Sequence, residues 1–156
     1  MRKRSSTKPP EPTFFTDRDL GRQIPEILER ADLLVERHDD HFPPHTLDVD
    51  WLREVGRRGW LALTHNKEIR YRTAERDMVM RAGVGLFMLI GHAPHAELAM
   101  NFVQTLSKVH AFLSTHDPPF IARVYRPSPA TDVTLGKPGR VELWLSLEQW
   151  KRLIDR

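Results

Sequence analysis

The chain has 156 residues, of which 40% are hydrophobic and 29% are charged, so it can bury a core and fold as a single domain. It contains no cysteine, which excludes disulfides, thiolate metal sites and cysteine catalysis and fits a reducing cytoplasm. No apolar run approaches the roughly 20 residues of a membrane span. We therefore expect a cytoplasmic protein that does not enter a membrane.

The formal net charge of +3 resides at the N-terminus. Residues 1–12 carry this excess by themselves, from Arg2, Lys3, Arg4 and Lys8 against Glu11. The rest of the chain is balanced in charge, which argues against a generic basic nucleic-acid binder. Because the first twelve residues are polar and contain three prolines, we predict a disordered basic tail there.

Apolar runs alternate with segments of helical spacing along the first two thirds of the chain. We predict strands at Thr13–Thr16, Leu33–Val35, Trp60–Leu63 and Gly85–Ile90. Between them we predict three helices: one from about Pro25, one capped by Asp48 or Asp50 and ended by Gly59, and one capped by Thr73 and ended by Gly83. This alternation predicts an α/β three-layer sandwich with a mostly parallel central sheet.

The last third of the chain is predicted to complete the same domain. A single helix is expected from about His95 to Leu113, followed by a strand at Phe120–Tyr125. A Pro/Gly-rich loop, Arg126–Arg140, leads to Val141–Leu145, which would pair antiparallel with that strand. Ser146 and Gln149 form a capping box that begins a short final helix. We thus predict a main domain over 13–125, with a loop, strand and helix over 126–156 packing on it as a small C-terminal β-hairpin and helix.

Polar residues stand where the predicted strands end. Asp17, Asp40 and Asn66 each follow a strand, and Asp50 lies at the start of the next helix. In open α/β sheets this edge forms the crevice that binds ligands. Carboxylates gathered there repel one another unless a hard cation such as Mg²⁺ or Mn²⁺ lies among them, and such a cation can activate water against a phosphodiester. The alternative is that Asp17 and Asp40 are loop residues and Asp50 is a helix cap.

A family resemblance adds to this pattern. The chain from about Phe14 to Ile90, with an extension to Val124, is similar to the PIN-like domain, a compact PIN nuclease fold related to the toxins of VapBC-type toxin–antitoxin pairs. Four runs carry the resemblance: FFTDRDLG, VERHDDHFPP, DVDWL and RRGWLALTHNKEIRYR. It implies a metal-dependent endoribonuclease that cleaves RNA, is neutralised by a cognate antitoxin and forms a homodimer. It also implies that Mg²⁺ or Mn²⁺ is held by Asp17, by Asp40 or its neighbour Asp39, and by Asp50 or its neighbour Asp48.

The resemblance has one departure. The family carries a further acid in the segment LT-x-D-K, where this chain has Asn66. An amide oxygen can ligate a hard cation but brings no charge, so we expect weaker metal binding and activity unless Glu68 substitutes. The departure also supports a second hypothesis, a catalytically silent PIN-like module that binds RNA or a protein partner.

The remaining polar residues near this edge have both a functional and an ordinary interpretation. Arg18, Lys67, Arg70 and Arg72 either position the phosphate backbone of a substrate or are plain surface charges. Tyr71 either stacks a base or is buried, and His65 is either a general base or a solvated loop residue.

The sequence gives weaker support to two other kinds of site, a zinc site and a phospho-receiver site. The pairs His38/His41 and His92/His95 have zinc-compatible spacing but no third fixed ligand. A phospho-receiver site would need its acid pair after the first strand, whereas Asp39 and Asp40 follow the second.

Overall fold

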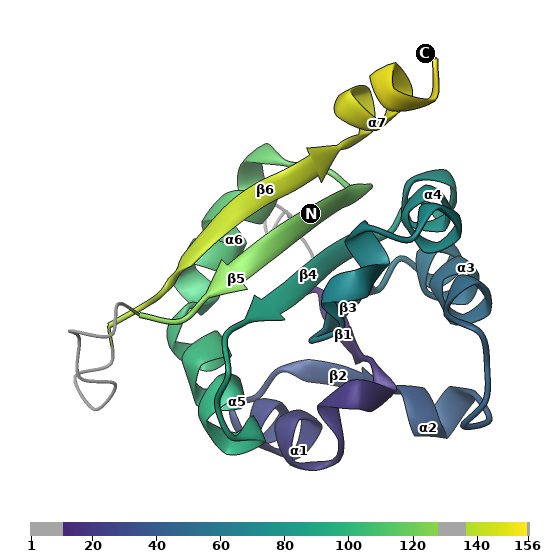
Figure 1. The fold of residues 1–156 in the computed structure, drawn as a ribbon. Coiled ribbons are helices and arrows are strands. Elements are labelled where there is room, and N and C mark those ends of the chain that lie inside the picture. The colour runs from purple at the N-terminus through teal and green to yellow at the C-terminus, as the bar shows by residue number, and fades with distance from the viewer. Residues whose placement is uncertain (1–10, 128–136, 156) are drawn as a thin grey trace, which may run out of the picture.

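One six-stranded sheet organises the molecule (Figure 1). The structure, a computed structural model, describes residues 11–127 and 137–155. The strand order is β2-β1-β3-β4-β5-β6, with parallel pairing from β2 to β5 and antiparallel pairing of β6 with β5. The predicted mostly parallel sheet with a C-terminal antiparallel hairpin is therefore confirmed. The strands are β1 (Thr13–Thr16), β2 (Leu34–Arg37), β3 (Leu61–Thr64), β4 (Gly85–Ile90), β5 (Phe120–Tyr125) and β6 (Arg140–Ser146).

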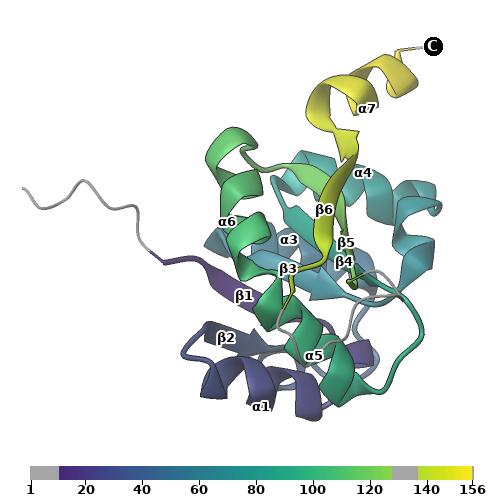
Figure 2. The ribbon, with the colours of Figure 1, turned by 90° about the vertical axis from the view of Figure 1, so that its left-hand side faces the viewer.

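Helices cover both faces of this sheet, which completes the predicted three-layer sandwich (Figure 2). Helices α1, α5 and α6 pack on one face, and α3 and α4 pack on the other. The helices are α1 (Gln23–Arg30), α2 (His38–His41), α3 (Asp48–Arg58), α4 (Thr73–Ala82), α5 (His95–Gln104), α6 (Leu106–Thr115) and α7 (Leu147–Ile154), with 3-10 turns η2 (Arg18–Leu20) and η3 (Lys67–Arg70). Within the described residues, no helix is long and apolar enough to cross a membrane.

Strand β1 is held between the two helical layers by adjacent aromatic residues. Successive strand residues point to opposite faces. The ring of Phe14 meets Phe102 of α5 edge-on at 5.4 Å, and the ring of Phe15 stacks on Trp51 of α3 at 5.3 Å. All four rings are buried, and burial of each contributes roughly 1.5–3 kcal/mol. Since β1 is locked from both sides, the residues that follow it are placed firmly at the carboxyl edge of the sheet.

The predicted single helix over 95–113 is wrong, because the structure has two helices separated at Thr105. The buried Thr105 hydroxyl donates to the Asn101 carbonyl at 2.7 Å and accepts from the Gly139 amide at 2.9 Å. This break ties the segment before β6 to the helical layer. The apolar spacing continues across the break, so periodicity could not indicate it.

Other helix ends differ in detail from the sequence predictions. The predicted caps Asp48, Asp50 and Thr73 lie inside their helices, because Leu47 and Arg72 occupy the N-cap positions. Gly59 and Gly83 do end α3 and α4, with φ of +73° and +76°, the left-handed region that glycine adopts without strain. The capping box of Ser146 and Gln149 is confirmed.

Two sequence predictions concern segments that the structure describes only in part. Of the predicted disordered tail over 1–12, residues 1–10 lie outside the described residues. Of the predicted loop over 126–140, residues 128–136 also lie outside them, and residue 140 already belongs to β6.

Candidate functional site

The carboxyl ends of β2, β1 and β3 adjoin, because these three strands are neighbours in the sheet. Asp17 follows β1 directly, and its amide donates to the Leu63 carbonyl of β3 at 3.0 Å. His38 follows β2, and Asn66 lies two residues beyond β3. Side chains from three separate segments thus meet at one edge, where open parallel sheets bind ligands.

Asp17 is the most enclosed carboxylate at this edge, with 6% of its surface exposed. One oxygen accepts from the Thr64 hydroxyl at 2.8 Å and the other from the Arg18 amide at 2.6 Å. Burial, followed by the nearby charge of Asp19, raises the pKa of Asp17 to about 7, and the Thr64 hydrogen bond opposes this shift. Asp17 is therefore partly protonated at neutral pH when no cation is bound.

Two further carboxylates act on Asp17. Asp19 in η2 accepts from the His65 amide at 3.1 Å and lies 3.4 Å from the Thr64 hydroxyl, and burial raises its pKa as well. Asp48, in the first turn of α3, accepts from the Trp51 indole at 2.8 Å, and its charge helps to raise the pKa of both Asp17 and Asp19. Three carboxylates, two from the turn after β1 and one from α3, are thus electrostatically linked.

These groups surround a cavity of about 360 Å³, which we call the acidic crevice. Its lining consists of Asp17, Arg18, Asp19, His38, Pro44, Thr46, Asp48 and Asn66. The amide oxygen of Asn66 accepts from the Glu68 amide at 3.0 Å and so caps η3. Glu68 itself is exposed and pairs with Arg72, so Asn66 is the polar side chain that this loop contributes to the crevice.

The part of the chain that forms the acidic crevice matches a known protein family. The model of the PIN like domain matches residues 12–91, just over half of the chain. The chain belongs to the PIN-like domain family. Its fold is therefore of the nuclease type. No curated protein and no solved structure matches the chain. The matched segment of the PIN-like domain spans β1 to β4 and contains every residue that lines the acidic crevice.

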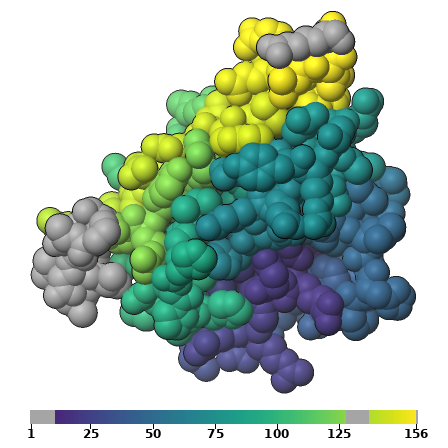
Figure 3. Space-filling view, in the orientation of Figure 1, coloured from purple at the N-terminus to yellow at the C-terminus, as the bar shows by residue number. Residues whose placement is uncertain are grey.

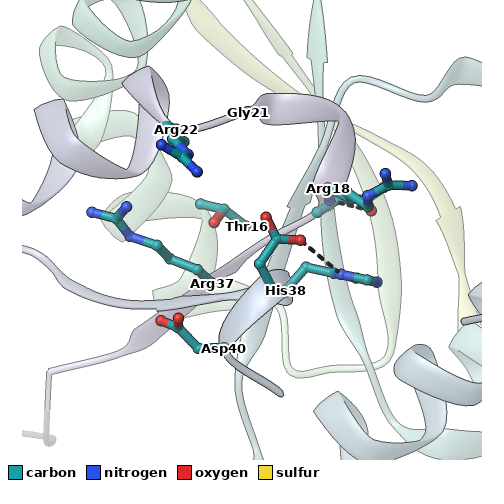
Figure 4. Close-up of a pocket in the computed structure, with 9 residues that line it drawn as sticks. Thr16, Arg18, Gly21, Arg22, Arg37, His38 and Asp40 are labelled. Atoms are coloured by element: carbon teal, nitrogen blue, oxygen red, sulfur yellow. Dashed lines mark hydrogen bonds and ion pairs between the residues drawn. The ribbon is translucent and has the colours of Figure 1, made fainter. Parts of the chain in front are cut away.

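The other carboxylates that were predicted to bind the metal, Asp40 and Asp50, do not line the acidic crevice of the PIN-like domain. Asp40 is exposed on α2 and lines a second cavity of about 170 Å³ together with Asp39, Arg22 and Arg37. Figure 4 shows Arg22 and Arg37 around Thr16, with Asp40 below them and Arg18 pointing away. Asp50 lies 3.4 Å from Arg53 and lines a third cavity with His41 and Glu54. Asp17 lines both of the first two cavities, whereas Asp50 lines neither.

The four predicted phosphate-binding residues are also distributed unequally. Arg18 lines the acidic crevice and donates to the Pro44 carbonyl at 2.9 Å. Lys67 lies in η3, and Arg72 pairs with Glu68. Arg70 lies over the ring of Tyr71. His65 contacts the Gly91 carbonyl through Nε2 at 2.9 Å, so its ring is engaged with the backbone.

Sequence reasoning did not single out Asp19 and ranked Asp48 behind Asp50. A signal for Asp48 was present, since Asp48, Trp51 and Val55 recur at helical spacing and Trp51 and Val55 are buried. Asp50 lies on a different side of α3 and is exposed. For Asp19 the signal was weaker, because a 3-10 turn that returns a side chain toward the preceding strand has no distinctive spacing.

The donors of the acidic crevice are those that hard divalent cations prefer. Carboxylate oxygens together with an amide oxygen suit Mg²⁺ or Mn²⁺. A cation would relieve the repulsion that helps to raise the pKa of Asp17. Among the residues that the structure describes, no three His, Cys, Asp or Glu side chains already stand together as a ligand group. The fit is thus one of donor chemistry and charge, and the zinc alternative has no third ligand in the described part of the chain.

Proposed function

We propose that this PIN-like protein is a divalent-metal-dependent endoribonuclease. The observation that carries the proposal is the meeting of Asp17, Asp19 and Asp48 around one crevice at the carboxyl edge of the sheet. The nuclease-type fold indicates the class of reaction, which is cleavage of a phosphodiester. This reaction needs stabilisation of negative charge, which a metal ion in an open crevice can provide.

Four residues of the crevice would hold the metal ion in this proposal. Asp17, Asp19 and Asp48 hold Mg²⁺ or Mn²⁺, and Asn66 contributes a neutral oxygen. The ion, when bound, supplies Lewis-acid stabilisation and a more acidic water. Thr64 keeps Asp17 oriented through its hydroxyl. Asp40 and Asp50 line other cavities, so we assign metal binding to Asp19 and Asp48 in their place.

Substrate positioning falls to basic residues beside the crevice. Arg18 is the cation that lines the crevice itself and offers guanidinium donors to a phosphate. Lys67, Arg70 and Arg72 follow at the exit of β3 and extend this basic character along the loop. They position the RNA backbone without reading its sequence.

The first experiment incubates the purified protein with a mixed RNA substrate and Mn²⁺ or Mg²⁺, beside an EDTA control. Asp17→Asn is expected to lower metal-dependent cleavage at least about 100-fold, because it removes the most enclosed charge of the site. Asp32→Asn, an exposed carboxylate in the turn after α1, is the matched control and should retain full cleavage. Asp48→Asn should reduce cleavage more than Asp50→Asn does.

A second readout does not depend on cleavage. Mn²⁺ should raise the melting temperature of the wild-type protein and of Asp32→Asn but not that of Asp17→Asn, because an ion that binds only the folded chain stabilises it. Cleavage that persists in EDTA, or equal Mn²⁺ stabilisation of all three proteins, would contradict the proposal.

The neutral Asn66 supports a second candidate, a catalytically silent PIN-like module that binds RNA or a protein partner. Asn66 stands where the family resemblance implies an acid, and it is engaged as the cap of η3. A well-folded protein that binds RNA but does not cleave it with either metal would favour this candidate. Asn66→Asp keeps the capping oxygen, so cleavage gained in that variant would identify the missing charge as the cause.

A toxin role, with a cognate antitoxin and a homodimer as partners, is the most specific form of the proposal and rests on the resemblance to VapBC-type toxins. Induced expression should arrest growth, and Asp17→Asn should abolish the arrest. Growth that is unaffected by the active enzyme would remove the toxin role and leave the nuclease.

A further inference from the structure

One side of the C-terminal hairpin is partly open and carries aromatic and basic residues. On the side that faces the viewer in Figure 1, helices α4 and α7 pack against Ile121 of β5 and Leu145 of β6, and the aromatic and basic residues lie beyond this covered part. Figure 3 shows this side, where the teal segment after β3 lies beside the yellow strand β6. We define the aromatic–arginine face as Arg70, Tyr71, Arg123, Tyr125, Arg140 and Trp144.

The first part of this face joins η3 to β6. The guanidinium of Arg70 lies 4.7 Å from the ring centroid of Tyr71 and 5.6 Å from that of Trp144. The two rings meet edge-on at 6.2 Å. Tyr71 is 66% exposed, which is unusual for a large aromatic side chain in a folded domain. Core packing therefore does not account for the position of Tyr71.

The second part of the face lies at the carboxyl end of β5. The guanidinium of Arg140 lies 4.1 Å from the ring of Tyr125, and that of Arg123 lies 5.9 Å from it. Glu142 pairs with Arg140 at 2.8 Å and lies 4.0 Å from Arg123. With this one carboxylate against Arg70, Arg123 and Arg140, the face keeps an excess of positive charge.

This face begins beside the acidic crevice. Asn66 lines the crevice and caps η3, which ends at Arg70. Tyr125 is the last residue of β5, whose carboxyl end lies at the same edge of the sheet as that of β1. A polymer that enters the crevice can therefore continue along the edge onto the face.

We propose that the aromatic–arginine face binds a single-stranded segment of RNA. Unpaired bases stack on Tyr71, Trp144 and Tyr125, because every base offers a flat π face to an aromatic ring. A guanidinium near an aromatic ring keeps N–H donors in its own plane, so the three arginines offer these donors to phosphates. Paired bases are stacked on one another and cannot use such a platform. The choice of RNA rests on the proposed function, but the binding itself needs neither metal nor cleavage.

The test measures binding without cleavage. A labelled single-stranded oligoribonucleotide of about 12 nucleotides, within the usual span of such sites, is titrated with protein in EDTA and followed by fluorescence anisotropy. The parent for all variants is the full chain with Asp17→Asn. Tyr71→Ala and Trp144→Leu are each expected to weaken binding at least about five-fold, because stacking of one base is lost. Tyr71→Phe and Trp144→Phe keep an aromatic ring, so their dissociation constants should lie within two-fold of that of the parent. This two-fold limit corresponds to about 0.4 kcal/mol in binding free energy.

Arg30→Ala is the matched charge control. Arg30 is exposed on α1, away from the aromatic–arginine face, so its loss should leave affinity unchanged, whereas Arg70→Ala should weaken it. Circular dichroism shows which variants are folded. If Trp144→Leu does not fold, the comparison of Tyr71→Ala with Tyr71→Phe is enough to test the inference.

The outcomes separate this inference from the proposed function. Folded Tyr71→Ala that binds as tightly as its parent overturns the inference, whether or not the wild-type protein cleaves RNA. A duplex of the same sequence that binds as tightly as the single strand also overturns it. Tyr71-dependent binding in a protein that never cleaves RNA supports the inference and removes the nuclease assignment.

Discussion

The acidic crevice and the aromatic–arginine face carry opposite charges. At the carboxyl ends of β1 and β3, the buried carboxylate of Asp17 lies beside the more exposed carboxylate of Asp19, and the Thr64 hydroxyl lies within 3.4 Å of both. On β5 and β6, arginines lie over exposed or half-exposed aromatic rings. The first region holds carboxylates close together around the buried Asp17, whereas the second combines positive charge with aromatic rings on an open surface.

This difference indicates a division of labour. Buried like charges lower the stability of the apo protein and are tolerated where a cation or reacting group is bound. Exposed rings beside arginines add affinity for a strand without any strained arrangement. Variants of the acidic crevice should therefore change stability and cleavage together, and variants of the aromatic–arginine face should change RNA affinity without changing stability.

The largest expected effect on stability is that of Asp17 itself. Burial and Asp19 raise its pKa to about 7 from the ordinary value of 3.8, so the folded chain keeps a proton that the unfolded chain releases. The free energy of unfolding should thus fall as pH rises from about 4 to 7, by up to ~4 kcal/mol. Asp17→Asn cannot titrate and should lose this part of the pH dependence. Urea unfolding of both proteins between pH 4 and pH 8 measures it, and parallel curves would refute the prediction.

A smaller effect is expected for Thr64→Val. The change removes a buried hydroxyl that donates to Asp17 and accepts from the Asn66 amide at 3.0 Å. Loss of these bonds should cost about 2 kcal/mol of stability. It should also raise the pKa of Asp17 further, because the Thr64 hydrogen bond lowers that pKa, so half-maximal cleavage should move to higher pH. Thr64→Ser keeps the hydroxyl and should show the wild-type pH profile.

The smallest of these effects is expected for Trp51→Phe. The buried indole donates to Asp48 at 2.8 Å, so phenylalanine keeps most of the packing but frees that carboxylate. We expect a loss of about 1 kcal/mol in stability and a loss of several-fold in cleavage. Oligoribonucleotide affinity in EDTA should not change, because Trp51 lies in the α3 layer. If Trp51→Phe lost as much RNA affinity as cleavage, the proposed separation of cleavage in the crevice from RNA binding on the aromatic–arginine face would be wrong.

Local patterns predicted the strands because each is a short apolar run bounded by turn residues. Gly85–Ile90 and Phe120–Tyr125 are strands with the predicted bounds, and the antiparallel pairing of β6 is also as predicted. The break at Thr105 was not predictable, since it depends on a hydrogen bond from Gly139, 34 residues away in sequence. Asp17 could be identified as a strand-end carboxylate because the strand before it is unambiguous. Its partners could not, because Asp48 and Asp50 differ only in helical phase.

The sequence by itself determined the alternation of strands and helices, the parallel sheet and the family, because these follow from apolar periodicity and short motifs in contiguous segments. Tertiary structure alone decided that Asp19 and Asp48 meet Asp17, and that Tyr71 lies against Trp144. The physical reason is that such meetings depend on strand order, register and helix rotation. These are set by packing across the sheet between residues far apart in the chain.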